Sequence, residues 1–302
     1  MIEPIRAYMK TGIILHVAYP EIGAGDGPVI DRLMRIIEDD SFDVVEIGGF
    51  KDPAVRAEAA RLIKIAHLDV AYGAQGKTLG SGLKLCDTDE EGRKKAVEAV
   101  KAAIDEAAEI GCFNVQFMSG TYQKGEEAAA YDQLIRSTKE LCAYAEATCG
   151  LPLVCEVFDY DIDKKALIGP ASLAKQYAED VCRDYPGFGL QVDLSHFPLC
   201  HETIAESVLP VRDYIRHAHM GNAVVKEGFP AYGDMHPRFG FPDSANDVPE
   251  LAEYLRTLID IGYLSKEAPG IVSFEVKPWG DEPSEAVIAN AKRALALAWA
   301  QV

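Results

Sequence analysis

Several common sequence features are missing from this chain of 302 residues. No run of about 18 consecutive apolar residues occurs, which argues against a membrane-spanning helix. The apolar stretch within residues 1–20 is too short and too poorly flanked for a signal peptide. No G-x-G-x-x-G follows the first expected strand, and no G-x-x-x-x-G-K-[ST] occurs, so the common phosphate-binding loops are not indicated. We therefore expect a cytoplasmic protein without membrane contact.

Positive charge and paired cysteines are also scarce. The chain has 30 Lys and Arg against 48 Asp and Glu, a formal net charge of -18. Such a surface repels phosphate backbones and anionic lipids, so a nucleic-acid partner is not expected. The 7 cysteines are scattered with no C-x-x-C pair, which is typical of reduced thiols in a cytosolic protein.

The chain does contain short β-rich runs that alternate with segments of helical periodicity. The expected strands are residues 12–20, 42–50, 68–75, 112–120, 152–160, 188–196, 214–222 and 270–278. Nearly continuous apolar strands indicate a parallel sheet covered by helices, and eight such units close into a (β/α)8 barrel. We expect an α/β fold with a single TIM-barrel domain over residues 1–302, with an open doubly wound sheet as the alternative.

One long segment, residues 222–247, is rich in Gly, Pro and Asp and has no helical or strand periodicity. Irregular segments of this length inside a compact domain are usually functional loops. We expect this segment to be an active-site loop.

Titratable side chains cluster at the ends of the last four expected strands. These are Glu156, Asp193 with His196, His217 with His219, and Glu275 with Lys277. In such a barrel the active site lies at the C-terminal ends of the strands. A single carboxylate there is more often a loop cap or a salt-bridge partner, but several buried charges in one ring of strands require a cation or each other.

The chemical nature of these side chains favours particular metals. Carboxylates with one imidazole form an oxygen-rich ligand set, which suits Mn²⁺, Mg²⁺ or Co²⁺ better than a structural Zn²⁺. We expect one divalent metal ion, with Mn²⁺ as the first choice.

The order of Glu, D-x-x-H, H-x-H and Glu on successive strands resembles the xylose isomerase-like TIM barrels, a superfamily of sugar phosphate isomerases and epimerases. The resemblance spans essentially the whole chain. It implies that Glu156, Asp193, His219 and Glu275 are the metal ligands and that Glu156 and Glu275 act as the acid and base. The implied reaction removes a proton next to a sugar carbonyl. The endonuclease branch of the superfamily is disfavoured by the acidity of the chain.

The same resemblance suggests residues for substrate binding. His196 corresponds to the substrate-binding histidine of the D-x-x-H motif and is also a catalytic candidate. The remaining candidates are His16, Glu46, His217, His236, Arg238 and Lys277. Three alternatives stay open: His217 as a core residue or a support for the metal ligands, Lys277 as a salt-bridge partner of Glu156, and His16 and Glu46 as solvated residues at strand ends.

One departure keeps other functions open. Ketose 3-epimerases carry an arginine six residues beyond the metal-binding histidine, and here that position is Val225. The basic group could instead come from Arg238 or His236 in the long loop. Stretches such as "VDLSHFPLCHE" and "VSFEVKPW" are similar to the catalytic subunit of C-glycoside deglycosidases. That resemblance implies β-elimination of the aglycone from a 3-oxo-C-glycoside and a small β-rich partner subunit.

Three functions therefore remain possible: a sugar isomerase or epimerase, a C-glycoside lyase, and a non-catalytic sugar-binding barrel. The expected ligand in each case is a small sugar or glycoside. The expected assembly is a homo-oligomer or a hetero-oligomer with a small β-rich subunit.

Overall fold

The computed structural model describes residues 3–302, which contain a closed parallel barrel of strand order β1 to β8. Its strands are β1 Met9–Ile14, β2 Val44–Ile47, β3 Asp69–Gly73, β4 Val115–Met118, β5 Leu153–Glu156, β6 Gly189–Asp193, β7 Ile215–Gly221 and β8 Gly270–Glu275. The barrel closes because β8 pairs with β1, with Gly270 opposite Met9 and Phe274 opposite Ile13. The predicted TIM barrel is thus confirmed.

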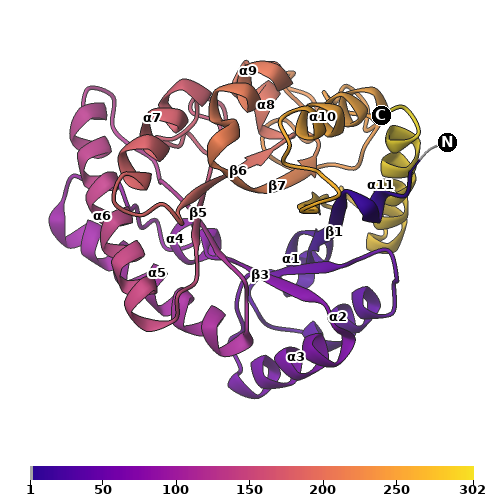
Figure 1. Ribbon diagram of the computed structural model, residues 1–302, viewed down its shortest axis with the longest axis horizontal. Helices are drawn as coiled ribbons and strands as arrows, with labels where there is room; N and C mark the ends of the chain where they lie inside the picture. The colour runs from indigo at the N-terminus through magenta and orange to yellow at the C-terminus, as the bar shows by residue number, and fades with distance from the viewer. Residues whose placement is uncertain (1–2) are drawn as a thin grey trace.

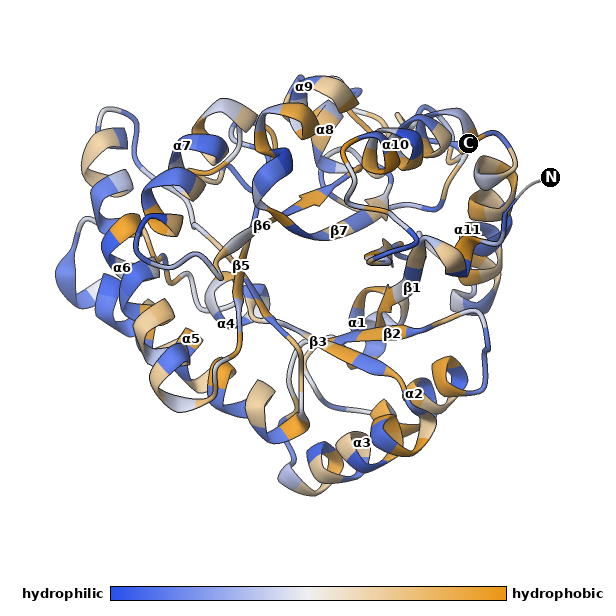
Figure 2. Ribbon diagram, viewed as in Figure 1, coloured by the Kyte–Doolittle hydropathy of each residue, from blue (hydrophilic) through white to orange (hydrophobic). Residues whose placement is uncertain are grey.

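Helices form a ring outside the strands (Figure 1). The longer ones are α2 Val29–Ile37, α3 Pro53–Ala66, α5 Glu90–Ile110, α6 Glu127–Thr148, α7 Ala171–Cys182, α10 Val248–Asp260 and α11 Ser284–Trp299. The shorter ones are α1 Leu15–Ala18, α4 Gln75–Leu79, α8 His196–Leu199, α9 Ile204–Val208 and the 3-10 turns η1 Ile5–Ala7, η2 Pro20–Ile22 and η3 Leu209–Tyr214. Figure 2 shows polar and apolar stretches alternating along the outer helices, as expected for helices that pack on a barrel with one face.

Local sequence signals fix where the helices begin and end. The Asp89 carboxylate accepts a hydrogen bond from the backbone N–H of Gly92 at 2.9 Å and caps α5. The same helix ends at Gly111, whose φ of 89° is accessible to glycine at low cost. Asp247 and Glu250 form a capping box at the start of α10. These caps define the residues at which the helices end and the connecting loops begin.

The first expected strand is shorter than its apolar run suggested. β1 ends at Ile14, and the next four residues form the short helix α1. Ile14 pairs with Glu46 at the last recorded position of the β1–β2 ladder, so the backbone beyond it lacks a strand partner. The Tyr19 N–H instead bonds to the Leu15 carbonyl at 3.0 Å, and this closes a helical turn.

Two backbone features shape the pairing of β7 with its neighbours. The pairing of β6 with β7 shifts register between Leu190 and Gln191, and beyond this shift Asp193 lies opposite His219. On the other side, a Cβ added to Gly221 would lie 2.7 Å from the Glu275 carbonyl oxygen. Glycine at this position therefore permits the close approach of β7 and β8 where both strands end.

No helix within residues 3–302 has the length and apolar character needed to cross a membrane.

Candidate metal centre and cavity

Four side chains at the C-terminal ends of neighbouring strands converge in the mouth of the barrel. Glu156, Asp193 and Glu275 are the last residues of β5, β6 and β8, and His219 lies near the end of β7. Each offers one ligand atom, and these atoms all lie within 4.8 Å of one another. The structure therefore brings together the four residues that the sequence suggested as metal ligands. We call them the four-residue centre.

Two carboxylate oxygens of the centre are buried without a hydrogen-bond partner. Asp193 Oδ1 accepts from the backbone N–H of Ser195 at 2.8 Å, and Glu156 Oε2 accepts from Gln75 Nε2 at 2.6 Å. Within residues 3–302, Glu156 Oε1 and Asp193 Oδ2 have no such partner. Unpartnered buried carboxylate oxygens are strongly destabilising unless a cation neutralises them. The donor set and its two open oxygens fit a divalent metal ion.

Burial and mutual repulsion shift the pKa values of the centre. Burial, together with the charge of Glu275, raises the pKa of Glu156 to about 7. Burial also raises the pKa of Asp193. Although burial acts to raise the pKa of Glu275 too, the imidazoles of His236 and His219 outweigh it and hold that pKa at about 2. Without a cation, the three carboxylates therefore resist being ionised together.

The imidazole of His219 presents Nδ1 to the carboxylates. This nitrogen lies 2.8 Å from Glu275 Oε2 and 3.7 Å from Glu156 Oε1, with the Gln191 amide at 3.2 Å. The opposite nitrogen, Nε2, lies 3.1 Å from Glu46 Oε2. Nδ1 is thus the nitrogen that faces the space enclosed by the carboxylates.

A second buried group is centred on Asp234, in the long loop after β7. Asp234 Oδ1 lies 3.1 Å from His196 Nε2 and 2.9 Å from His236 Nε2. Lys164, from the loop after β5, lies 2.8 Å from Asp234 Oδ2. Burial lowers the pKa of His236, but Asp234 more than compensates and raises it to about 9. Asp234 therefore holds two loops and two imidazoles together beside the centre.

The two imidazoles of this second group also lie close enough to Asp193 to share an ion with it. Asp193, His196 and His236 offer ligand atoms that lie within 4.8 Å of one another. His196 is oriented by its Nδ1, which lies 2.8 Å from the Val157 carbonyl oxygen. Asp193 is therefore close both to the other members of the four-residue centre and to the imidazoles of the second group.

A cavity of about 240 Å³ is lined by three members of the centre, Glu156, His219 and Glu275. The polar lining consists of His16, Glu46, Gln75, Gln116, Glu156, Lys164, His219, Asp234, His236, Glu275 and Lys277. The apolar side chains of the lining are Ile14, Val17, Leu79 and Phe158. Polar groups of several kinds beside an apolar wall are the usual means of orienting a small molecule.

The remaining sequence-predicted residues divide into two sets. His16, Glu46, His236 and Lys277 line the cavity. The ion pairs of Glu156 are with His196 and His219 rather than with Lys277, so the salt bridge left open for that lysine is not observed.

Three predicted substrate contacts, His196, His217 and Arg238, are outside the cavity lining. His217 is fully buried and is not part of the cavity lining, and its Nε2 lies 2.7 Å from Glu46 Oε1. This matches the alternative of a core or supporting residue. The structure does not bring Arg238 to the cavity, because its Nε donates to Glu282 Oε1 at 2.9 Å. The expectation that Arg238 replaces the arginine missing at Val225 is not supported by this placement.

Several residues of the site were missed in the sequence. Asp234 stands two residues before His236, and this D-x-H spacing in a loop was an available signal. Gln75, Gln116 and Gln191 carry no charge, so nothing distinguished them from ordinary polar residues. Their roles depend on the barrel interior, which only the closed sheet defines.

One family model and several solved structures are similar to this chain. A family model described as "Xylose isomerase-like TIM barrel" matches residues 34–296. A D-tagatose 3-epimerase-like protein is 19% identical, with 96% of this chain and 98% of that chain covered at a TM-score of 0.70. D-psicose 3-epimerase from Clostridium cellulolyticum H10 is 17% identical, with 97% and 96% covered at a TM-score of 0.65.

A 3-keto-D-glucoside 4-epimerase from E. coli is 18% identical, with 96% of this chain and 98% of that chain covered at a TM-score of 0.67. No curated protein sequence matches the chain. At these identities the likeness to solved structures establishes a shared fold.

Proposed function

The chain belongs to the xylose isomerase-like TIM barrel family, and from that membership we propose that it is a metal-dependent sugar isomerase or epimerase. The proposed reaction removes a proton from the carbon next to a sugar carbonyl. The observation that carries the proposal is the four-residue centre, which has two buried carboxylate oxygens without a hydrogen-bond partner. Three of its members, Glu156, His219 and Glu275, line a small polar cavity. Sugar epimerases among the structural neighbours support the same class of reaction.

The proposed cofactor is one Mn²⁺ ion, with Mg²⁺ and Co²⁺ as alternatives. Glu156, Asp193, His219 and Glu275 would hold it, because three carboxylates and one imidazole make an oxygen-rich donor set. Such an ion, when bound, withdraws charge from a sugar carbonyl and so makes the adjacent C–H bond more acidic.

Glu156 and Glu275 are the proposed acid and base. Both line the cavity, and they come from different strands, β5 and β8. A carboxylate positioned beside the acidic C–H bond can accept the proton and return it. A proton returned to the opposite face of the same carbon gives an epimer, whereas a proton returned to the neighbouring carbon gives the isomer.

Substrate oxygens are proposed to bind to His16, His236 and Lys277, which line the cavity. His196 is not among the lining residues, and its Nε2 is paired with Asp234. We therefore propose that His196 acts through Asp234 and His236 rather than by direct contact with the sugar.

Proton exchange tests this function directly. Ketohexoses and 3-oxo glycosides are incubated with Mn²⁺-loaded protein in deuterated water, and deuterium at the exchanging carbon is followed by NMR. Glu156→Gln and Glu275→Gln should each slow exchange by about 100-fold or more, which is the usual contribution of a positioned acid or base. The matched control is Glu253→Gln, at an exposed position on α10, which should exchange at the wild-type rate.

Two outcomes would refute the proposal. Exchange at near wild-type rates in both glutamine variants would remove Glu156 and Glu275 from the chemistry. Protein that binds sugar but neither binds metal nor exchanges protons would indicate the non-catalytic sugar-binding barrel.

A C-glycoside lyase is the second candidate, and the surroundings of the cavity favour it. Val225 is 41% exposed where ketose 3-epimerases carry arginine, and Arg238 is paired with Glu282. Apolar side chains among the lining residues, such as Leu79 and Phe158, offer apolar surface for an aglycone. This candidate would act with a small β-rich partner subunit. Release of aglycone from a 3-oxo-C-glycoside only when that partner is present would establish it over the isomerase.

A further inference from the structure

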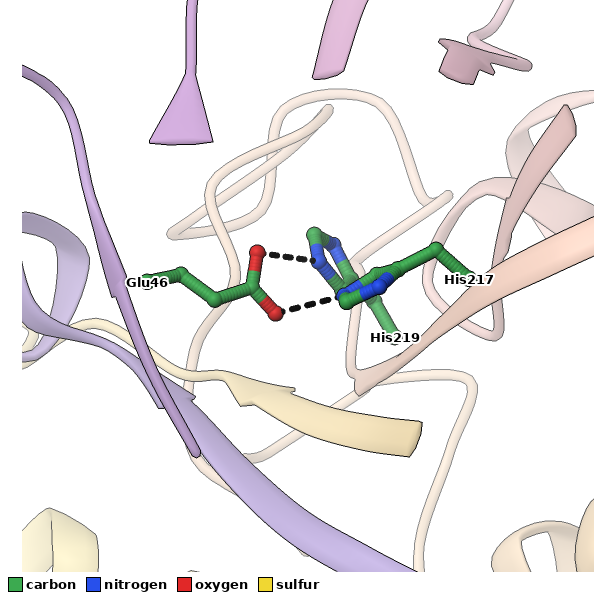
Figure 3. Close-up of side chains that lie close together, drawn as sticks. All are labelled: Glu46, His217 and His219. Atoms are coloured by element: carbon green, nitrogen blue, oxygen red, sulfur yellow. Dashed lines mark hydrogen bonds and ion pairs between the residues drawn. The ribbon is translucent and has the colours of Figure 1, made fainter. Parts of the chain in front are cut away.

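Glu46 binds two imidazoles of β7 at once. Its side chain extends from β2 to the facing side of the barrel, where Oε1 lies 2.7 Å from His217 Nε2 and Oε2 lies 3.1 Å from His219 Nε2 (Figure 3). Oε2 also accepts from the Gln116 amide at 2.7 Å. Glu46 is 1% exposed. Both of its carboxylate oxygens are therefore already engaged by protein groups.

These contacts argue against Glu46 as a substrate ligand. A sugar hydroxyl that bonded to this carboxylate would have to share it with His217, His219 and Gln116. They equally argue against a separate cation between Glu46 and the two imidazoles, although the three side chains are close enough to hold one. Both Nε2 atoms are at hydrogen-bond distance from a carboxylate, which is the arrangement of two N–H donors and one acceptor.

The consequence concerns the protonation pattern of His219. A neutral imidazole carries its proton on one nitrogen and a lone pair on the other, and the hydrogen bond at one nitrogen decides which. The ionised Glu46 carboxylate can only accept hydrogen bonds, so its contact with Nε2 favours a proton on that nitrogen of His219. Glu275 Oε2 lies 2.8 Å from Nδ1 and is an acceptor too, so without a cation both nitrogens of His219 can carry a proton. A metal ion held at Nδ1 would require the lone pair there, and the one remaining proton would then be the Nε2 proton that Glu46 accepts.

We propose that Glu46 is a positioning residue that fixes the Nε2–H form of His219 and thereby keeps Nδ1 available to the metal ion. His217 supports this role as a second donor to the same carboxylate. The surroundings of His217 agree, because the Asn114 amide lies 3.4 Å from its Nδ1 while its Nε2 faces Glu46. The inference rests on the proposed metal centre and assigns to Glu46 a task distinct from substrate binding.

Metal affinity tests the inference without any assay of activity. Mn²⁺ binding is measured by calorimetry for wild type, Glu46→Gln and the exposed control Glu253→Gln. The glutamine introduced by Glu46→Gln is nearly the same size as glutamate but can present an N–H to one of the imidazoles, which removes the preference for Nε2–H. This variant should bind Mn²⁺ about 10–100-fold more weakly, the usual cost of losing a group that orients a metal-bound histidine. The control should bind as wild type does.

A measurement on the wild type alone guards against a variant that fails to fold. In ¹⁵N-histidine-labelled protein loaded with diamagnetic Zn²⁺, NMR should show His219 with a proton on Nε2 and metal on Nδ1. The reverse assignment, or unchanged Mn²⁺ affinity in Glu46→Gln, would overturn the positioning role while leaving the metal centre intact. Absence of Mn²⁺ binding by the wild type would overturn both.

Discussion

Replacing Asp193 by asparagine separates the metal-binding role of this residue from its structural role. An asparagine oxygen can still accept the hydrogen bond from the Ser195 N–H that Asp193 Oδ1 accepts at 2.8 Å. The change removes the negative charge of Oδ2, which has no hydrogen-bond partner within residues 3–302. Asp193→Asn should therefore fold normally and bind Mn²⁺ poorly.

The expected signal can be calculated. A ligand at 100 times its dissociation constant stabilises the folded state by about 2.7 kcal/mol. At about 2.1 cal/mol/K per residue, the unfolding entropy of 302 residues is about 0.6 kcal/mol/K, so saturating Mn²⁺ should raise the wild-type melting temperature by about 4 °C. The shift should fall below about 1 °C in Asp193→Asn.

Differential scanning calorimetry with and without Mn²⁺ provides the assay, and Glu253→Gln is the control. Burial raises the pKa of Asp193, so its charged form opposes folding and the metal-free variant should melt no lower than metal-free wild type. A full Mn²⁺ shift in Asp193→Asn would refute its assignment as a ligand. A large loss of stability in the metal-free variant would show that the carboxylate has a structural role instead.

Two further predictions concern stability. Burial raises the pKa of Glu156 from 4.5 to about 7, so the folded protein holds this proton more tightly than the unfolded chain does. The stability that results is complete below about pH 4.5 and is lost as the pH rises to about 7. Across that window, the free energy of unfolding of metal-free wild type should fall by about 3 kcal/mol relative to Glu156→Gln in urea titrations, and parallel curves would contradict this. Gly221→Ala should cost about 1–3 kcal/mol in the same assay, because its Cβ would lie 2.7 Å from the Glu275 carbonyl oxygen. Gly187→Ala, with nothing within 4 Å of the added Cβ, should be nearly neutral, and equal losses in the two variants would exclude crowding as the cause.

The sequence predicted the barrel because the signal for it is local. Each strand of a covered parallel sheet is apolar on both faces, and each helix repeats its apolar positions with its own period. The main local error was at residues 15–18, where an apolar run continues into helix α1 after β1 has lost its partner. The sequence alone indicates that such a run is buried, but it does not show where the hydrogen-bond ladder to the neighbouring strand ends.

The candidate site was predictable only where it depends on strand ends. Glu156, Asp193 and Glu275 end three strands, so the barrel rule brings them together without further information. Asp234 lies in an irregular loop, whose path depends on contacts such as the ion pair with Lys164. No periodic pattern predicts such contacts, and for the same reason the sequence did not reveal that Arg238 is paired with Glu282.

The most direct test of the account is anomalous X-ray diffraction from crystals grown with Mn²⁺. One strong anomalous peak per chain is expected, enclosed by Glu156, Asp193, Glu275 and the Nδ1 atom of His219. No peak at that position, or a peak bound only by other residues, would contradict it.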